Sequence, residues 1–290
     1  MGSSIAPLLV ARAGRPLARN PAPPRLQPVA PPRRRLGLGR PLPYGWALGP
    51  VLLLALWALG STTGRIDPRI LPAPWAVVTT GWDLAAQGKL QHNLATSCLR
   101  ALEGLSIGVP LGIAVALVSG LSRLGGYLFD GVVQIKRSIP VLALIPLLML
   151  WFGIGEGMKV TVISLSVFIP IYLQLHDALR GIDSRYVELA ESLRVGRLGF
   201  IRHVVLPGAL PGLLLGLRYA VTGSLLALVV VEQINATSGI GYMIDLARSY
   251  GQSNIIVLGL VIYAVLGFSA DAALRLVQRW ALPWRRTLAP

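Results

Sequence analysis

Six apolar segments, separated by shorter polar or charged stretches, constrain the fold of this chain more than any other feature. A helix needs about 20 apolar residues to cross the hydrocarbon core of a bilayer, and about 17 residues is the lower limit. Each of the six segments reaches that length. We therefore predict an all-α, polytopic membrane protein with about six transmembrane helices. The segments are residues 44–60, 94–121, 124–152, 161–179, 208–233 and 255–277.

The composition supports this class. Of the 290 residues, 54% are hydrophobic and only 13% are charged, whereas a soluble domain carries about 25% charged residues. Pro140 and Pro146 interrupt the third segment, so we expect a kink or a break there. Small residues recur every four positions in the second and fifth segments, and this spacing favours close helix packing, more within one subunit than between subunits. They are Gly104, Gly108 and Gly112, and then Gly208, Gly212, Gly216, Ala220 and Ser224.

The basic residues predict an orientation. With six crossings and a cytoplasmic N-terminus, the cytoplasmic pieces hold 18 arginines, and the external pieces hold five lysines and arginines. This asymmetry is the positive-inside bias of membrane proteins. It predicts that both termini are cytoplasmic and explains the formal net charge of +15. Because this charge is not gathered on one polar domain, we predict no nucleic-acid partner.

The chain divides into four predicted regions. Residues 1–43 hold eight arginines, no acidic residue and many prolines, which is typical of a disordered cytoplasmic tail. Residues 44–93 contain the first transmembrane helix and an external segment, in which residues 76–90 could form an amphipathic surface helix. Residues 94–280 form the core of the membrane domain, and residues 281–290 form a basic tail.

The longest strongly charged piece of the second half lies at residues 188–211, between the fourth and fifth apolar segments. Ser184 could cap a helix there, and Gly199 could end it. Its acidic residues come early and its basic residues come late, which suits the helix dipole. Periodicity alone leaves two alternatives open, an ordinary surface helix or a docking element for another protein.

Three motifs in this chain resemble those of one family. Glu188, Leu189 and Ala190, followed by Val204, Leu206 and Pro207, resemble the EAA loop of ATP-binding-cassette (ABC) importer permeases. The glycine of that loop is replaced by Arg194, with Gly196 two residues later. Residues 138–156 and 231–245 resemble the nitrate, sulfonate and taurine branch of the family. The resemblance extends from about residue 94 to about residue 280.

The resemblance implies a MetI-like permease fold and a transport subunit that is not itself an enzyme and holds no cofactor or metal. It implies a bacterial cytoplasmic (inner) membrane location, with membrane lipid around the chain. Its partners would be a second copy of the chain, a pair of ATPase subunits inside and a solute-binding protein outside, periplasmic or lipid-anchored. The helix at about residues 184–200 would couple the permease to the ATPase. The residues expected to take part in coupling are Glu188, Ala190, Glu191, Arg194, Gly196, Leu206 and Pro207.

Polar residues within the apolar segments are candidates for a transport pathway or gate, because charges inside a membrane are costly and often functional. Lys136 and Arg137, just before Pro140, could face a pathway for anions or could extend to the inner headgroups. Arg218 has the same two alternatives. Glu232 and Gln233, near the outer end of their segment, match the family pattern and are expected to line an outer gate.

Two other classes of function were considered. An ion- or proton-coupled secondary transporter often shows internal repeats and acidic residues in the middle of its spans, and neither is clear here. An intramembrane enzyme would need catalytic groups clustered at one depth. The sequence contains no G-x-x-x-x-G-K-[ST] loop for ATP phosphates, so the energy for an ABC importer would come from a separate ATPase. The expected cargo is nitrate, a sulfonate, taurine or a similar small anion, on the resemblance alone.

Overall fold

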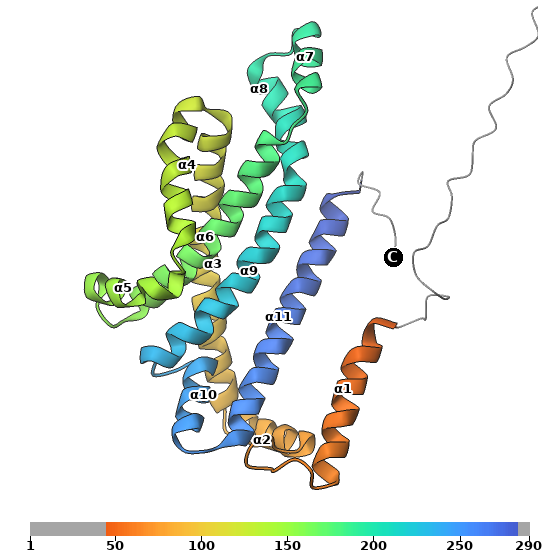
Figure 1. The fold of residues 1–290 in the computed structure, drawn as a ribbon, viewed down its shortest axis with the longest axis vertical. Helices are drawn as coiled ribbons and strands as arrows, with labels where there is room; N and C mark the ends of the chain where they lie inside the picture. The colour runs from red at the N-terminus through yellow and green to blue at the C-terminus, as the bar shows by residue number, and fades with distance from the viewer. Residues whose placement is uncertain (1–44, 284–290) are drawn as a thin grey trace, which may run out of the picture. The chain divides into compact units, whose positions relative to one another are not determined.

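The computed structural model describes residues 45–283, and these residues form helices and connecting turns without β-strands (Figure 1). The predictions for the tail of residues 1–43 and for residues 284–290 lie outside this part. The elements are α1 (Gly45–Thr62), α2 (Pro74–Ala86), α3 (Lys89–Leu121), α4 (Arg123–Ser138), a 3₁₀ turn (Val141–Leu144), α5 (Ile145–Phe152), α6 (Glu156–Arg180), α7 (Ser184–Ser192), α8 (Arg197–Phe200), a π-helical turn (Ile201–Val205), α9 (Leu206–Asn235), α10 (Ile240–Ser249) and α11 (Ser253–Ala281).

Four helical segments of the described part are long and apolar enough to cross a membrane. They are α3, α6, the continuous run Arg197–Asn235, and α11. The bent pair α4–α5 would be a fifth, and α1 contributes a shorter apolar helix, Ala47–Thr62. Length and composition thus support four or five of the six predicted spans.

The predicted interruption near Pro140 is confirmed. The chain bends by 91° between α4 and the following 3₁₀ and α5 segments. Ile139 takes an extended conformation ahead of Pro140, and Pro146 lies in the first turn of α5. A residue before proline avoids the helical region, and proline fits the first turn of a helix, so the two prolines end one helix and begin the next.

Small residues bring α3, α6 and α9 together. A Cβ atom placed on Gly108 would lie 2.6 Å from the carbonyl oxygen of Ser164 on α6. A Cβ on Gly212 would lie 2.7 Å from the carbonyl oxygen of Gln174 on the same helix. Both glycine rows therefore pack against α6 within one chain, as the spacing favoured.

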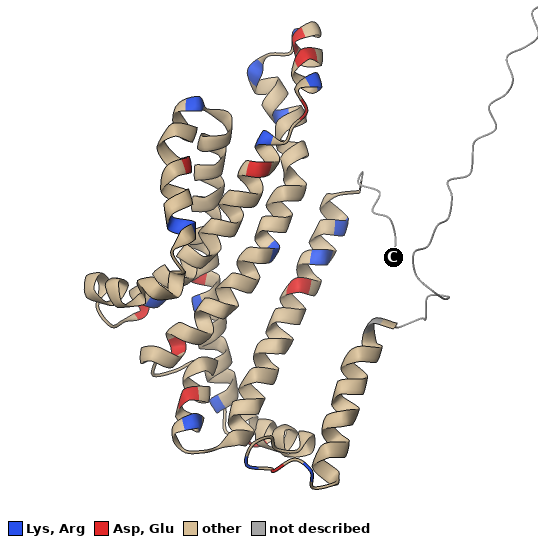
Figure 2. Cartoon of the chain, in the orientation of Figure 1, with Lys and Arg blue, Asp and Glu red and all other residues tan. Residues whose placement is uncertain are grey.

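Charged residues are distributed unevenly along these helices. Figure 2 shows long uncharged stretches on α3, α6, α9 and α11 and a group of residues of both signs on α7 and α8. Large exposed side chains on the long helices are mostly apolar, including Leu102, Leu226 and Phe268. This pattern is the one expected of helices in contact with lipid or with neighbouring helices in a membrane.

Candidate functional site: a charged turn and an interior ion network

The stretch predicted as one helix over residues 184–200 is two helices with a break. Asp183, not Ser184, is the N-cap of α7, because its carboxylate accepts a hydrogen bond of 2.9 Å from the backbone N–H of Arg185. Gly199 lies inside α8 and does not end the helix. The element made of α7, α8 and the turn between them, residues 184–200, is called the coupling element below, after the role that the resemblance implies for it.

Arg194 forms the break. Its φ of 53° is the left-handed conformation, and it is the only non-glycine residue with positive φ among the described residues. The N–H of Arg194 bonds to the carbonyl of Glu191 at 3.0 Å, and the N–H of Val195 bonds to the carbonyl of Ala190 at 2.8 Å. This pair of bonds is a Schellman motif, which normally places glycine at the left-handed position. The family glycine that Arg194 replaces therefore has a conformational explanation.

This conformation leads to a prediction for Arg194→Gly. A left-handed conformation costs a side-chain-bearing residue about 1 kcal/mol, so glycine should stabilise the turn. Hydrogen–deuterium exchange at residues 190–196 should slow. Arg185→Gly, at an exposed position in the ordinary helical part of α7, should instead speed exchange, because glycine disfavours a helix by up to about 1 kcal/mol. Equal shifts in both variants would contradict the proposed role of the turn.

The remaining coupling candidates lie on both sides of this break. Glu188 and Glu191 are exposed on α7, and Gly196 precedes α8 as its N-cap. Leu206 and Pro207 begin α9 after the π-helical turn, so they lie apart from α7 in the chain but at the same end of the fold (Figure 1). Arg197 ties the element to α3 through a hydrogen bond of 3.2 Å to the carbonyl of Leu121.

The coupling element exposes large apolar side chains. The exposed fractions are 54% for Leu189, 68% for Leu193 and 80% for Leu198. Unlike the exposed leucines of the long helices, these three alternate with glutamate and arginine in a segment too polar to lie in hydrocarbon. Exposed apolar side chains in a polar segment are candidates for contact with another protein.

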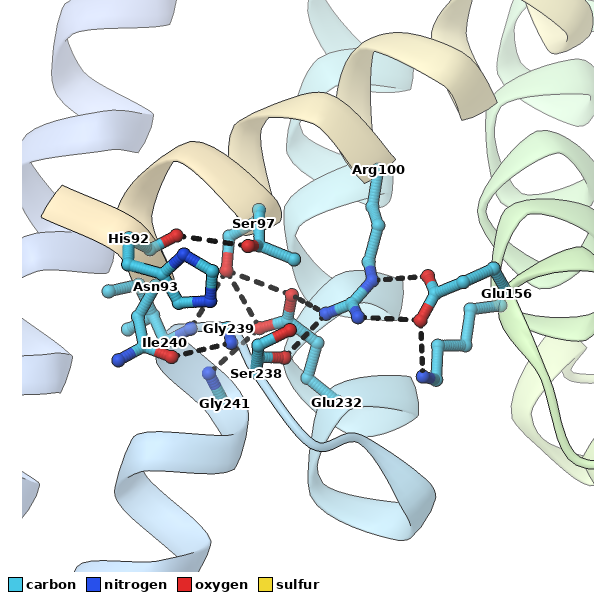
Figure 3. A network of polar contacts seen from close by, with 12 residues as sticks. His92, Asn93, Ser97, Arg100, Glu156, Glu232, Ser238, Gly239, Ile240 and Gly241 are labelled. Atoms are coloured by element: carbon cyan, nitrogen blue, oxygen red, sulfur yellow. Dashed lines mark hydrogen bonds and ion pairs between the residues drawn. The ribbon is translucent and has the colours of Figure 1, made fainter. Parts of the chain in front are cut away.

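A second group of functional candidates lies at the other end of α9 (Figure 3). Glu232 is fully buried, with both carboxylate oxygens occupied. The hydroxyl of Ser97 donates to them at 2.8 and 2.9 Å, and Arg100 donates to Oε1 at 2.8 Å. The backbone N–H of Gly241 and the hydroxyl of Tyr263 donate to Oε2 at 2.8 and 3.1 Å. This interior ion network therefore connects α3, α9, α10 and α11.

Arg100 extends the network to α6. Its guanidinium group binds Glu156 through two hydrogen bonds of 2.6 and 2.7 Å, and Lys159 donates to the same carboxylate at 2.8 Å. Arg100 also donates to the carbonyl of Ser238 at 2.6 Å. The positive charges of Arg100 and Lys159 thus balance the negative charges of Glu156 and Glu232, and the network has no net charge. Charge pairing of this kind is what permits charged groups inside a membrane domain.

The backbone of the turn between α9 and α10 lies close against the carboxylate of Glu232. Gly239 has a φ of 118°, and a Cβ atom there would lie 2.6 Å from Oε2 of Glu232. A Cβ on Gly241 would lie 2.6 Å from Cβ of Glu232. Glycine is therefore required at both positions so that the backbone can approach the acid. Asn93 on α3 accepts a hydrogen bond of 2.8 Å from the N–H of Gly239, and this bond ties the turn to α3.

The environments of Glu232 and Gln233 bear on their predicted role in an outer gate. Among the described residues, the carboxylate of Glu232 is fully buried within the network rather than exposed. Gln233 is half-buried beside it. Ser97, Arg100 and Glu156 were not among the predicted site residues, although the position of Arg100 within an apolar segment was a signal for it.

The other pathway candidates lie in different environments. Lys136 donates to the carbonyl of Leu165 on α6 at 2.9 Å, whereas Arg137 and Pro140 are exposed at the bend after α4. Arg218 forms an ion pair of 2.5 Å with Asp271 on α11. Lys136 and Arg218 are bound to different helices, α6 and α11, and the structure does not bring them to one site.

Comparison with known proteins identifies the family. The sequence pattern of the family described as binding-protein-dependent transport system inner membrane component matches residues 108–282. The chain belongs to this family. It is a permease subunit of an ABC importer, and not an enzyme or a secondary transporter. The family match covers the coupling element, Glu156 and Glu232, and it begins after Arg100.

Two relatives of this permease are named for transport of sulfur compounds. It is 44% identical over 239 residues to the aliphatic sulfonates transport permease SsuC of Escherichia coli, covering 82% of this chain and 90% of that protein. It is 33% identical over 238 residues to the taurine transport system permease TauC of the same organism, covering 80% and 86%. An amino acid ABC transporter crystallised with histidines has a similar fold, with a TM-score of 0.53, 18% identity, and coverage of 64% of this chain and 91% of that one.

Proposed function

We propose that this permease imports an aliphatic sulfonate or a related small sulfonate such as taurine. It would act as a pair of identical subunits, with two ATPase subunits on the cytoplasmic side and one solute-binding protein outside. ATP-driven closure of the ATPases would move the coupling elements and open the pathway alternately to the two sides. The names of the SsuC and TauC relatives support the cargo.

The exposed apolar face of the coupling element is the observation that carries the coupling role. It combines exposed leucines with charged residues, and a groove on an ATPase would cover it. The positive-inside bias of the sequence supports a cytoplasmic position for this element, and with it cytoplasmic termini. Glu188, Glu191 and Arg194 would lie at the contact. Leu206 and Pro207 would transmit its movement into α9.

The test combines co-purification with uptake. Leu189→Asp together with Leu193→Asp should prevent a tagged permease from retaining its ATPase, because each exposed apolar contact at an interface centre contributes about 1 kcal/mol or more. Uptake of radiolabelled ethanesulfonate should fall about tenfold or further. Glu188→Ala should also lower uptake.

Val78→Asp provides a matched control. Val78 is 71% exposed on α2, at the opposite end of the fold. This variant should retain both the ATPase and uptake. Retention of the ATPase by the double aspartate variant, together with full uptake in Glu188→Ala, would refute the coupling role. Uptake of nitrate by the wild-type permease, with no uptake of ethanesulfonate or taurine, would refute the cargo alone.

A further inference from the structure

A second group of charged residues lies between α9 and α11, away from the interior ion network. Asp271 accepts from Arg218 at 2.5 Å and from Arg275 at 2.7 Å, each on a different carboxylate oxygen. The arginine side chains are 42% and 43% exposed. Among the described residues, neither guanidinium group has another hydrogen-bond or ion-pair partner. Several N–H donors are therefore directed outward from a fixed position.

These arginines line an open cavity of about 550 Å³. Arg279, one turn beyond Arg275 on α11, lines it too, with Gln278 and apolar residues of α9. Two of these three arginines pair with the carboxylate of Asp271, so the group of four side chains has a net charge of two positive units. Arginine binds phosphate through paired N–H donors, and a cavity of this composition suits a tetrahedral oxyanion.

An apolar cavity of about 440 Å³ continues from the first along the same two helices. Arg218 lines both cavities. The walls of the second are mostly hydrocarbon, from Leu225, Leu226 and Phe268 among others, with Thr222, Tyr263 and Asp271 as further polar lining. We call the two cavities together the α9–α11 furrow. A charged head and an apolar extension next to it fit an anionic amphiphile better than a free inorganic ion.

The position of the furrow along α11 matches a membrane surface. Asp271 is 18 residues from the first residue of α11, which corresponds to about 27 Å of helix, and the hydrocarbon core is about 30 Å thick. Arg275 and Arg279 follow in the last two turns, where Figure 2 shows basic residues near the end of the helix. Trp280, 86% exposed, is the type of residue found at headgroup level. The charged cavity therefore lies at the boundary that the sequence predicts to be cytoplasmic.

We propose that the α9–α11 furrow binds an anionic phospholipid of the cytoplasmic leaflet. The lipid phosphate lies among Arg218, Arg275 and Arg279, and an acyl chain follows the apolar cavity toward the middle of the membrane. Basic pockets between transmembrane helices on the cytoplasmic side are suited to such headgroups. The proposal depends on the orientation of the permease but not on its cargo.

The test is lipid retention by the purified, full-length permease in native mass spectrometry, with phosphatidylglycerol or phosphatidylcholine added at equal concentration. Wild-type protein should retain phosphatidylglycerol and not phosphatidylcholine. Arg275→Gln with Arg279→Gln should weaken retention roughly thirtyfold, because each basic residue near a headgroup contributes about fivefold. Asp271 keeps Arg218 as its partner in this variant, so no acid is left unpaired.

Arg248→Gln is the matched control, because Arg248 also forms an ion pair of 2.5 Å, with Asp245, but lies on α10 at the other end of α11. It should retain the lipid as the wild type does. Unchanged retention in the double variant overturns the proposal. Displacement of phosphatidylglycerol by millimolar ethanesulfonate or inorganic phosphate also overturns it, since the furrow would then be a site for a soluble anion. A failure of the coupling experiment leaves this result unaffected.

Discussion

Arg100→Leu should lower the free energy of unfolding by about 3–5 kcal/mol, the range for breaking a buried ion pair by removing one partner. Among the residues that the structure describes, the arginine is the one that bonds to both Glu232 and Glu156. Without it, Glu232 keeps Ser97, Gly241 and Tyr263 as neutral donors but loses the one cationic partner it has in this part of the chain. Denaturant titration of the detergent-solubilised permease measures the change.

Two further variants make this prediction specific. Arg123→Leu removes an exposed arginine that has no ion pair among the described residues, and it should change stability by no more than about 0.5 kcal/mol. In a double-mutant cycle, the cost of Arg100→Leu should be smaller in the Glu232→Gln background, because the acid is already neutral. An additive cycle would show that the two charges do not stabilise each other.

Gly108→Val should lower the free energy of unfolding by about 3 kcal/mol, a loss second only to that expected for Arg100→Leu. The new Cβ would lie 2.6 Å from the carbonyl oxygen of Ser164 and 2.8 Å from Cβ of Val167. A backbone oxygen cannot rotate away as a flexible side chain can, so α3 and α6 would have to separate. The same denaturant titration measures the loss.

Gly131→Val is the control for the change in residue type. A Cβ atom at Gly131, on α4, would meet no atom of another described part of the chain within 4 Å. Valine is a better helix former than glycine, so this variant should be as stable as the wild type or slightly more so. If both valine variants lose stability equally, close packing of α3 on α6 is not the cause.

The sequence predicted the long helices well, because lipid selects uninterrupted apolar segments and hydropathy records them directly. The break near Pro140 was predictable for an equally local reason, since proline limits the backbone of its own and the preceding residue. The end of α7 was not predicted. Gly199 was the local signal for a helix end, but the turn is made by Arg194, a residue that is intrinsically unfavourable there.

The hydrogen-bond partners of Glu232 could not be predicted from local sequence patterns. Ser97 and Arg100 are 135 and 132 residues away in the sequence, and only the packing of α3 against α9 brings them together. Arg218 shows the same limit, because its partner Asp271 is on a different helix. Ionisable residues in apolar segments could be recognised as candidates, but their pairing required the three-dimensional arrangement.

The continuous helical run Arg197–Asn235 has a mechanical consequence. Its 39 residues make a rod of about 58 Å that begins within the coupling element and ends just beyond the buried Glu232. A helix of this kind moves as a rigid body. A small rotation at its first residues therefore displaces its other end without rearrangement of the side chains in between. The π-helical turn at residues 201–205 is a place along it where such a movement could be absorbed by a change in hydrogen-bond register.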